Sequence, residues 1–371
     1  MTTTPPPRQR ARDLGLPFDG RPGTLNAITD VSGVEVGYTT LIEGEGERSV
    51  RTGVTVVLPR GRHGVGVPVA SGVYSMNGNG ELTGSHWIEE TGLLTLPIGL
   101  TNSHAVGSVH RGIIDWVVEN HPNVSADWLL PVVAETYDGD LNDINGNHVT
   151  SQHVASALDA AVSGSVPEGN VGGGTGMICY EFKGGSGTAS RRVTYGDSEW
   201  HVGAFVQANF GSREELVLAG QGIGKQIPLQ PQPVAPTRPP GGGSVIVIVA
   251  TDAPLLPAQC KALARRVPLG LARTGTTGSH FSGDIFLAFS TGNESSVHSG
   301  YTDRPTLGQL DAMTFLPWGH IDRLFAATVQ AVEEAVVNVL CAAETMTGRH
   351  GLTVPSLPLE LVATTRGPAR S

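Results

Sequence analysis

One junction in the chain could carry nucleophilic chemistry. A proline-rich and then glycine-rich stretch, residues 226–243, leads directly into Ser244 and the apolar segment SVIVIVATDAP. A serine hydroxyl is a weak nucleophile that needs a neighbouring base. If Ser244 attacked the carbonyl carbon of Gly243, an N-to-O acyl shift would give an ester that water could cleave. Ser244 would then be N-terminal, and its α-amine, for which a pKa of about 7.7–8.0 is usual, could act as the base.

The same residues have a simpler interpretation. A Gly/Pro turn that leads into a strand accounts for residues 239–244 without any chemistry, and these residues alone favour it. A glycine before the serine is compatible with both interpretations. It removes side-chain hindrance and permits the strained backbone that an acyl shift requires.

The common signatures of other catalytic sites are absent from the sequence. There is no G-x-S-x-G elbow, no S-x-x-K, no H-E-x-x-H and no P-loop. His148 and His153 fit surface or capping positions better than metal ligation. The glycine run at 169–176 could cradle an anion through its N–H groups, but it lacks the Lys-Ser/Thr ending of a nucleotide loop, so a tight structural turn is favoured. We therefore expect neither a metal nor a cofactor.

Composition argues against several classes of function. The net charge is −10 and no Lys/Arg run follows the short cluster Arg8–Arg12, so no basic stripe is available for nucleic acid. Cys179, Cys260 and Cys341 are widely spaced and are expected to be buried thiols rather than disulfide partners or zinc ligands. No signal peptide and no stretch long enough to span a bilayer is recognised. A cytoplasmic protein without membrane contact is expected.

The candidate residues must be positioned by elements on both sides of the 226–243 linker. The run of β-branched residues after Ser244 is typical of a buried strand. Further strands are expected at 54–58, 192–195, 202–207 and 285–290, and helices at 106–120, 150–162, from Pro257 to about Pro268, and at 321–347 with Gly348 as the stop. The part after the linker has too few strands for a sheet of its own. We expect a disordered arm at 1–12 and one α/β (α+β) domain at 13–371, in four layers: helix, sheet, sheet, helix.

Nine sequence blocks resemble the β-peptidyl aminopeptidases and L-aminopeptidase/D-amidases of the DmpA type, in the order that this family shows. They are LNAITDVSGVEVGYT, NGNGELTG, LLPVVAET, LNDINGN, EGNVGGGTGM, VQANFG, SVIVIVATDAPLLP, SGDIFLAFSTGN and CAAETMTG. The resemblance extends from about Ala11 to Gly348. It implies an αββα sandwich like that of N-terminal-nucleophile hydrolases, with different connectivity.

The resemblance also implies a maturation step. The chain would cut itself between Gly243 and Ser244 into 13–243, which keeps the arm, and 244–371. The two chains would stay together and assemble into a homo-oligomer, a tetramer of such pairs.

Site roles follow from the same resemblance. Ser244 in SVIVIVATDAP would be the nucleophile. Ser282 and Asp284 in SGDIF would form a polar relay near its amine and hydroxyl. Asn209 in VQANFG would donate its amide to the oxyanion, a role that suits a neutral, preorganised donor. Glu135 in VVAET would pair with the free N-terminal ammonium of the substrate.

Four of these residues have a structural alternative. Ser282 could cap a turn, and Asp284 could satisfy backbone N–H groups at a strand entry. Asn209, which comes just before Phe210 and Gly211, could be a turn residue, and Glu135 could be a solvated helix residue. Residue types alone favour these alternatives, whereas the family resemblance favours the functional roles.

The function expected is that of an aminopeptidase or amidase. It would hydrolyse N-terminal residues from short peptides and aminoacyl amides or esters, including β-amino acid peptides, through an acyl-enzyme on Ser244. Two alternatives remain at this point. One is acetyl transfer of the glutamate/ornithine type by a related self-cleaving fold, and the other is a non-enzymatic small-molecule binder.

Overall fold

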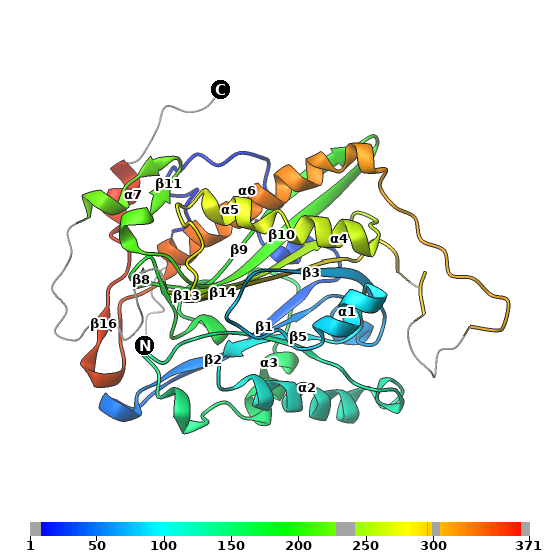
Figure 1. The fold of residues 1–371 in the computed structure, drawn as a ribbon, viewed down its shortest axis with the longest axis horizontal. Helices are drawn as coiled ribbons and strands as arrows, with labels where there is room; N and C mark the ends of the chain where they lie inside the picture. Colours follow the sequence, from blue (N-terminus) through cyan, green and yellow to red (C-terminus); the bar gives the residue numbers. More distant parts are fainter. Residues whose placement is uncertain (1–8, 228–241, 295, 299–304, 365–371) are drawn as a thin grey trace, which may run out of the picture.

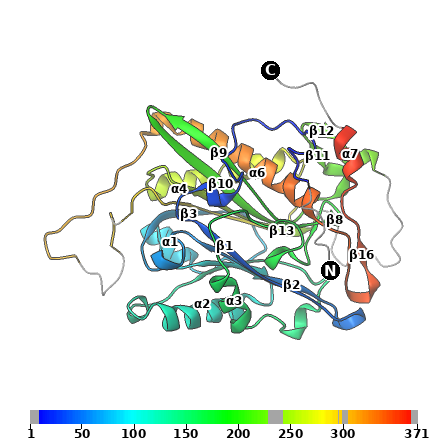
Figure 2. The same ribbon diagram turned by 180° about the vertical axis from the view of Figure 1, so that it is seen from behind.

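Two β-sheets pack face to face between two layers of helices (Figure 1), and Figure 2 shows the same layers from behind. This computed structural model describes residues 9–227, 242–294, 296–298 and 305–364. The four-layer α/β sandwich expected from the sequence is confirmed. Strands from before and after the 226–243 segment share one sheet, as the scarcity of strands after it requires.

The smaller sheet has the strand order β1-β2-β5-β6. Its strands are β1 (Glu35–Glu43), β2 (Val50–Leu58), β5 (Ile98–Asn102) and β6 (Val132–Thr136). The outer face of this sheet is covered by α2 (Val106–Asn120) and α3 (Ser151–Asp159). Thr150 is the N-cap of α3, and its N–H donates to Nδ1 of His153 at 3.2 Å, so His153 has the capping role that the sequence suggested.

The larger sheet has the order β4-β3-β14-β13-β10-β9. Its strands are β3 (Val69–Gly78), β4 (Leu93–Leu94), β9 (Gly185–Tyr195), β10 (Ser198–Asn209), β13 (Gly243–Thr251) and β14 (Ser282–Ser290). The central strands β13 and β14 are parallel, and β13 is antiparallel to β10. Three helices cover its outer face: α4 (Pro257–Ala264), α5 (Val267–Ala272) and α6 (Asp322–Ala342).

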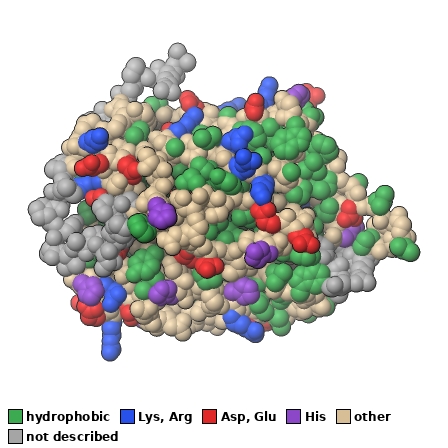
Figure 3. All heavy atoms as spheres, in the orientation of Figure 1, with side chains coloured by type: hydrophobic (Ala, Val, Ile, Leu, Met, Phe, Trp, Pro, Cys, Tyr) green, Lys and Arg blue, Asp and Glu red, His purple; other side chains and the backbone are tan. Residues whose placement is uncertain are grey.

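Smaller elements surround the sandwich. They are α1 (Ser85–Thr91), α7 (Leu359–Thr364), and the two-stranded pairs β7 (Ile178–Cys179) with β8 (Phe182–Lys183), β11 (Val217–Leu218) with β12 (Gln221–Gly222), and β15 (Met346–Thr347) with β16 (Thr353–Val354). The three cysteines are buried and free, as expected. Both basic and acidic side chains lie on the face that Figure 3 shows.

The core alternates along β13 because successive side chains of a strand point to opposite faces. Ile246 and Ile248 lie in the apolar layer between the two sheets. Val245 and Val247 lie in the layer beneath α4, α5 and α6. Ser244 precedes this pattern by one residue, so its side chain belongs to the face between the sheets.

The predicted disordered arm, 1–12, extends too far along the chain. Residues 1–8 lie outside the described residues, but residues 9–12 are placed on the domain. Ala11 is fully buried, and Nε of Arg12 lies 2.9 Å from a carboxylate oxygen of Glu334. A buried acidic partner more than 300 residues away leaves no local signal in the sequence. Of the predicted linker, residues 228–241 also lie outside the described residues.

The last long helix is shorter than predicted, and Gly348 does not close it. α6 ends at Ala342. Beyond this end, the side chain of Asn170 forms hydrogen bonds with the backbone of Glu344. Its Nδ2 donates to the Glu344 carbonyl at 2.8 Å, and its Oδ1 accepts from the Glu344 N–H at 3.1 Å. The chain therefore leaves the helix, and Met346 already belongs to β15.

By length and composition, α6 is the one helix among the described residues that could cross a membrane, contrary to the expectation that no stretch is long enough. In the fold, 78% of its apolar window is buried. The helix packs on β9 and β10. Its apolar character is therefore accounted for by the core that it covers.

Candidate active site

Ser244 lies where the two sheets meet. It is the second residue of β13 and is almost fully buried. Its Oγ accepts a hydrogen bond from the backbone N–H of Tyr137, at 3.3 Å. Tyr137 directly follows β6 of the smaller sheet. The serine hydroxyl is therefore held between the carboxyl end of one strand and the amino end of another.

Gly243 has no room for a side chain. A Cβ at this position would lie 1.9 Å from the carbonyl oxygen of Asn209, which no side chain could tolerate without a backbone shift. Asn209 is also the residue that faces Ser244 in the β10–β13 pairing. The glycine before the serine is thus required by close packing against the neighbouring strand, a reason that the sequence alone could not reveal.

Asn209 is the last residue of β10 and is buried, so the alternative that it is a turn residue is wrong. Its Oδ1 accepts from the N–H of Ile178 at 2.9 Å, and its Nδ2 donates to the carbonyl of Tyr137 at 2.8 Å. These two bonds fix which end of the amide points toward Tyr137. The donor nitrogen, Nδ2, therefore points toward Tyr137, whose N–H contacts the Ser244 hydroxyl.

Ser282 and Asp284 form a buried pair at the start of β14. The hydroxyl of Ser282 donates to Oδ1 of Asp284 at 2.5 Å, and Nδ2 of Asn77 donates to Oδ2 at 2.9 Å. Burial raises the pKa of Asp284, against the hydrogen bonds from Ser282, Asn77 and the Val245 backbone. Ser282 is the first residue of β14, and its hydroxyl bonds to Asp284 and not to the preceding turn. Asp284 accepts from the backbone of Val245, which agrees with its alternative role at a strand entry.

The pair approaches Ser244 through the backbone. In the parallel β13–β14 register, Gly283 faces Ser244 while Asp284 faces Val245. Asp284 therefore shares the face of Phe286, beneath the helices, whereas the hydroxyl of Ser244 lies between the sheets. The carboxylate of Asp284 instead interacts with the backbone of Val245, the residue after Ser244.

Glu135 is a buried strand residue, and the alternative of a solvated helix residue is wrong. Oε1 accepts from the N–H of Glu81 at 3.1 Å, and Oε2 accepts from the hydroxyl of Ser103. Gly80 lies near both this carboxylate and β14: a Cβ on Gly80 would lie 3.1 Å from Oε1 and 3.3 Å from Cα of Gly283. Burial raises the pKa of Glu135, and the Ser103 hydroxyl and Glu81 N–H oppose this shift.

Asn209, Ser282 and Asp284 thus lie on the strands beside the start of β13, and Glu135 lies on β6. Asp284 faces away from the Ser244 hydroxyl, so the predicted relay reaches the backbone beside Ser244 and not that hydroxyl.

The structure adds Tyr137, Asn77 and Ser103, which the sequence interpretation did not single out. Asn77 stands in the block NGNGELTG, so its position in a family block was a signal for it. Tyr137 follows LLPVVAET and contributes only backbone groups, for which the sequence holds no signal.

The glycine run at 169–176 is structural. The N–H of Gly172 donates to Oγ1 of Thr40 at 2.9 Å, and that of Gly173 to Oγ1 of Thr55 at 3.0 Å. These N–H groups are therefore engaged by β1 and β2 and do not face an anion. The interpretation as a tight turn is confirmed.

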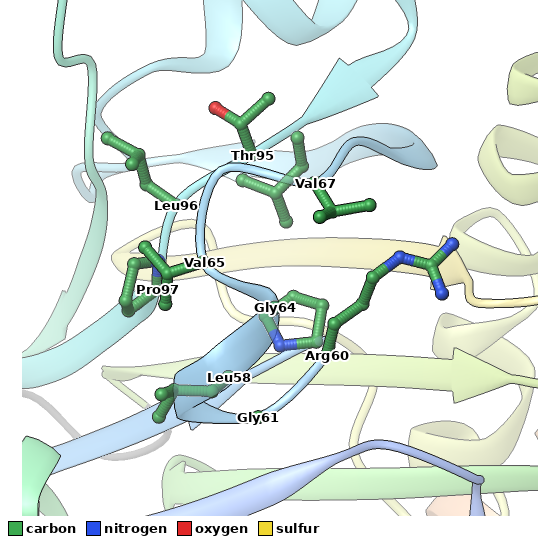
Figure 4. Close-up of a pocket in the computed structure, with 11 residues that line it drawn as sticks. Leu58, Arg60, Gly61, Gly64, Val65, Val67, Thr95, Leu96 and Pro97 are labelled. Atoms are coloured by element: carbon green, nitrogen blue, oxygen red, sulfur yellow. The ribbon is translucent and has the colours of Figure 1, made fainter. Parts of the chain in front are cut away.

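A closed pocket near the end of β2 offers no substrate site. Its lining includes Leu58, Val65 and Leu96, and it contains none of the predicted site residues (Figure 4). The cavity volume is about 10 Å³, room for about one water molecule.

Comparisons with known proteins agree with this geometry. The family description "Peptidase family S58" matches residues 26–354. The beta-peptidyl aminopeptidase BapA of Sphingosinicella microcystinivorans is 48% identical over 365 residues, covering 94% of this chain and 89% of that one. The BapA of Sphingosinicella xenopeptidilytica is 45% identical, covering 95% and 90%.

Two solved structures share the fold over nearly the whole chain. A Burkholderia sp. beta-aminopeptidase has a TM-score of 0.89 at 46% identity, covering 96% of this chain and 98% of that one. The L-aminopeptidase D-Ala-esterase/amidase of Ochrobactrum anthropi, described as a prototype for the serine aminopeptidases and a variant of the Ntn hydrolase fold, has a TM-score of 0.85 at 46% identity, covering 95% and 96%.

Proposed function

The chain belongs to peptidase family S58 and is a serine-type aminopeptidase with amidase chemistry, and we propose that Ser244 becomes its N-terminal nucleophile by self-cleavage. The observation that supports this most directly is the packing at the junction. Gly243 is pressed against Asn209, and the Ser244 hydroxyl is held by Tyr137.

Maturation would use the same groups as turnover. The hydroxyl oxygen of Ser244 attacks the carbonyl carbon of Gly243, the C–N bond breaks, and the nitrogen takes up the proton. Water then hydrolyses the resulting ester, leaving a carboxylate on Gly243 and a free hydroxyl and amine on Ser244. The Tyr137 N–H, which contacts the Ser244 hydroxyl, and the Asn209 amide, which contacts Tyr137, would supply the hydrogen bonds to the oxyanion in both reactions.

In turnover, the free amine of Ser244 would take the proton of its own hydroxyl as the hydroxyl attacks the substrate carbonyl. The proton then goes to the leaving amine, and an acyl-enzyme ester forms on Ser244. Water hydrolyses the ester in the second half of the cycle. Ser282 and Asp284, which touch the backbone beside Ser244, would orient the amine for this transfer.

Glu135 would select substrates with a free N-terminus. Its carboxylate is buried and oriented by Ser103 and the Glu81 N–H, so pairing with an ammonium would relieve the cost of a buried charge. Gly80 lies near both Glu135 and Gly283, the residue that faces Ser244, so the substrate ammonium would lie near the scissile carbonyl. The names of the relatives at 48% and 45% identity favour substrates whose N-terminal residue is a β-amino acid.

The processed pairs would assemble into a homo-oligomer, a tetramer as the resemblance implies. The segment before α6 projects from the sandwich (Figure 1). On it Leu307 is 103% exposed and Leu310 89% exposed, which is costly for leucine unless another copy covers them. The Leu307→Asp/Leu310→Asp double variant should run smaller than wild type in light scattering, while Leu269→Asp on α5 should not. A wild type that runs as a single pair would contradict the proposal. The cytoplasmic location stays a prediction from the sequence.

The acetyl-transfer and binder alternatives are not favoured by the family match. The test is a panel of aminoacyl anilides. Those with a free β- or α-amine should be hydrolysed, and the same compounds with an acetylated amine should not. Hydrolysis of the acetylated compounds at equal rates would contradict the role of Glu135, and acyl transfer to glutamate in place of hydrolysis would favour the transferase.

A further inference from the structure

Lys183 carries a charge into the interior beside the active site. It is the last residue of β8 and is completely buried, a rare position for lysine. Its Nζ donates to the carbonyls of Met177 and Gly184, at 2.8 Å each. Burying an ammonium is costly, so its retention calls for a role.

The Met177 carbonyl belongs to the Met177–Ile178 peptide unit, which also contacts the candidate active site. The same unit carries the N–H of Ile178, which donates to Oδ1 of Asn209 at 2.9 Å. The Lys183 ammonium therefore binds the oxygen of the Met177–Ile178 peptide. The N–H of the same peptide binds Oδ1 of Asn209. Hydrogen-bonded amides in series polarise one another, most strongly where water is excluded.

The short β7–β8 hairpin holds this series in place. Ile178 and Lys183 are register partners, and the connecting residues Tyr180 and Glu181 both have left-handed backbones, with φ of +52° and +61°. Such a turn is unfavourable for residues with a side chain. The two carbonyl bonds of Lys183 brace it from inside.

We propose that Lys183 is a positioning residue for the oxyanion site: through the Met177–Ile178 peptide it orients the Asn209 amide and increases the positive charge on its donor end. The inference rests on the proposed function, in which Asn209 stabilises the oxyanion. Burial lowers the pKa of Lys183 to about 7, while Cys179 and Asp138 act in the opposite direction, so the side chain is about half charged at neutral pH and fully charged only below it.

The test uses Lys183→Met, which keeps the length but removes the charge and the donors. Removing an oxyanion donor outright costs about 100- to 1,000-fold in kcat. Weakening one should lower kcat by about 10- to 100-fold, with KM changed less than about threefold. A boronic acid analogue of the aminoacyl group, which forms the oxyanion on Ser244, should lose affinity by the same factor as kcat. Lys261→Met, at an exposed lysine paired with Glu89, is the matched control and should leave kcat unchanged.

A double-mutant cycle separates this role from mere structural support. In the Asn209→Ala background, Lys183→Met should have little further effect on kcat per processed chain, because the Ile178 N–H then has no Asn209 amide to polarise. Lys183→Gln keeps an uncharged donor for the two carbonyls and is expected to lie between wild type and Lys183→Met. It keeps the inference testable should the Met variant fail to fold. Circular dichroism and urea unfolding serve as the check of folding, because self-processing uses the same oxyanion donors and should slow together with turnover.

The outcomes distinguish the inference from the function on which it rests. An unaffected kcat in a folded, charge-free variant, or equal losses in the Asn209→Ala and wild-type backgrounds, would overturn the role of Lys183 alone. Full activity of Asn209→Ala by itself would instead overturn the assignment of Asn209 in the proposed function.

Discussion

The backbone N–H of Tyr137 lies 3.3 Å from Oγ of Ser244, although the two residues belong to segments that end and begin in different sheets. The carbonyl of Tyr137 meanwhile accepts from Asn209 at 2.8 Å. One residue therefore contacts both the hydroxyl and the amide that the proposed mechanism requires. Because these contacts cross from β6 to β13 and β10, the site depends on the docking of the two sheets and not on any one loop.

Replacing Gly243 should block maturation. In Gly243→Ala, the added methyl group would lie 1.9 Å from the Asn209 carbonyl oxygen, so β13 must shift away from β10. A displacement of about 1 Å can cost about 100-fold in rate. Self-cleavage, followed on a denaturing gel over time, should slow by at least that factor. Gly222→Ala is the control, since a Cβ there meets nothing within 4 Å. A Gly243→Ala chain that processes at the wild-type rate would disprove this packing argument.

Glu135→Gln should separate maturation from turnover. Maturation involves no substrate ammonium, so the variant should cleave itself normally. Loss of a charge-assisted bond of about 1.5–3 kcal/mol should raise KM for free-amine substrates by about 10- to 100-fold. Glu119→Gln on the exposed face of α2 is the control. A Glu135→Gln chain that stays unprocessed would assign Glu135 to folding or maturation instead, and a fully active one would refute its role in amine recognition.

The pH dependence of KM should carry the signature of Glu135. Burial raises its pKa, so the carboxylate is protonated at a higher pH than an exposed glutamate would be. As pH falls through that raised pKa, the charge that pairs with the substrate is lost and KM for free-amine anilides should rise. In Glu135→Gln, KM should be flat over the same range. An unchanged acid limb in the variant would assign the limb to another group, such as the Ser244 amine.

A buried acidic residue should stabilise the contact between the parts of the chain before and after Gly243. The carboxylate of Glu334 is fully buried and meets Arg191 at 2.7 Å and Arg12 at 2.9 Å, both from the part of the chain before Gly243. Removing one member of a buried pair typically costs about 3–5 kcal/mol. Glu334→Gln should lose about that much in urea unfolding, measured in an uncleaved Ser244→Ala background.

The adjacent Glu333 supplies the control for that experiment. It pairs with Arg273 near the surface, where an ion pair is worth less than about 1 kcal/mol. Glu333→Gln should therefore be nearly neutral. Equal losses of unfolding free energy for Glu333→Gln and Glu334→Gln would show that the buried ion pairs of Glu334 add no more stability than the pair of Glu333 with Arg273.

The sequence predicted those features that depend on local pattern. The apolar run after Ser244 became β13, and the helical spacing at 106–120 matched α2. It failed where distant residues decide. Asn170 binds the backbone just after the end of α6, before Gly348 is reached. Glu334 forms an ion pair with Arg12, so that this residue packs on the domain.

The site shows the same division. Sequence blocks located Ser244, Asn209 and Glu135, because a family resemblance preserves residue types in order. They could not show that Tyr137 contributes backbone groups, since any residue type has them. Nor could they show that Asp284 lies on the opposite face of the sheet from the Ser244 hydroxyl, because that depends on the β13–β14 register.

The central claim is that Ser244 is made N-terminal by self-cleavage and then acts as the nucleophile. Intact-mass spectrometry of the purified protein, beside the rate on a free-amine anilide, tests it most directly. The wild type should give two masses, with the smaller fragment beginning at Ser244 and the pair active. Ser244→Ala should give one mass, that of the uncut chain, and no hydrolysis. An uncut wild type that is active, a fragment that begins at another residue, or an active Ser244→Ala would contradict the account.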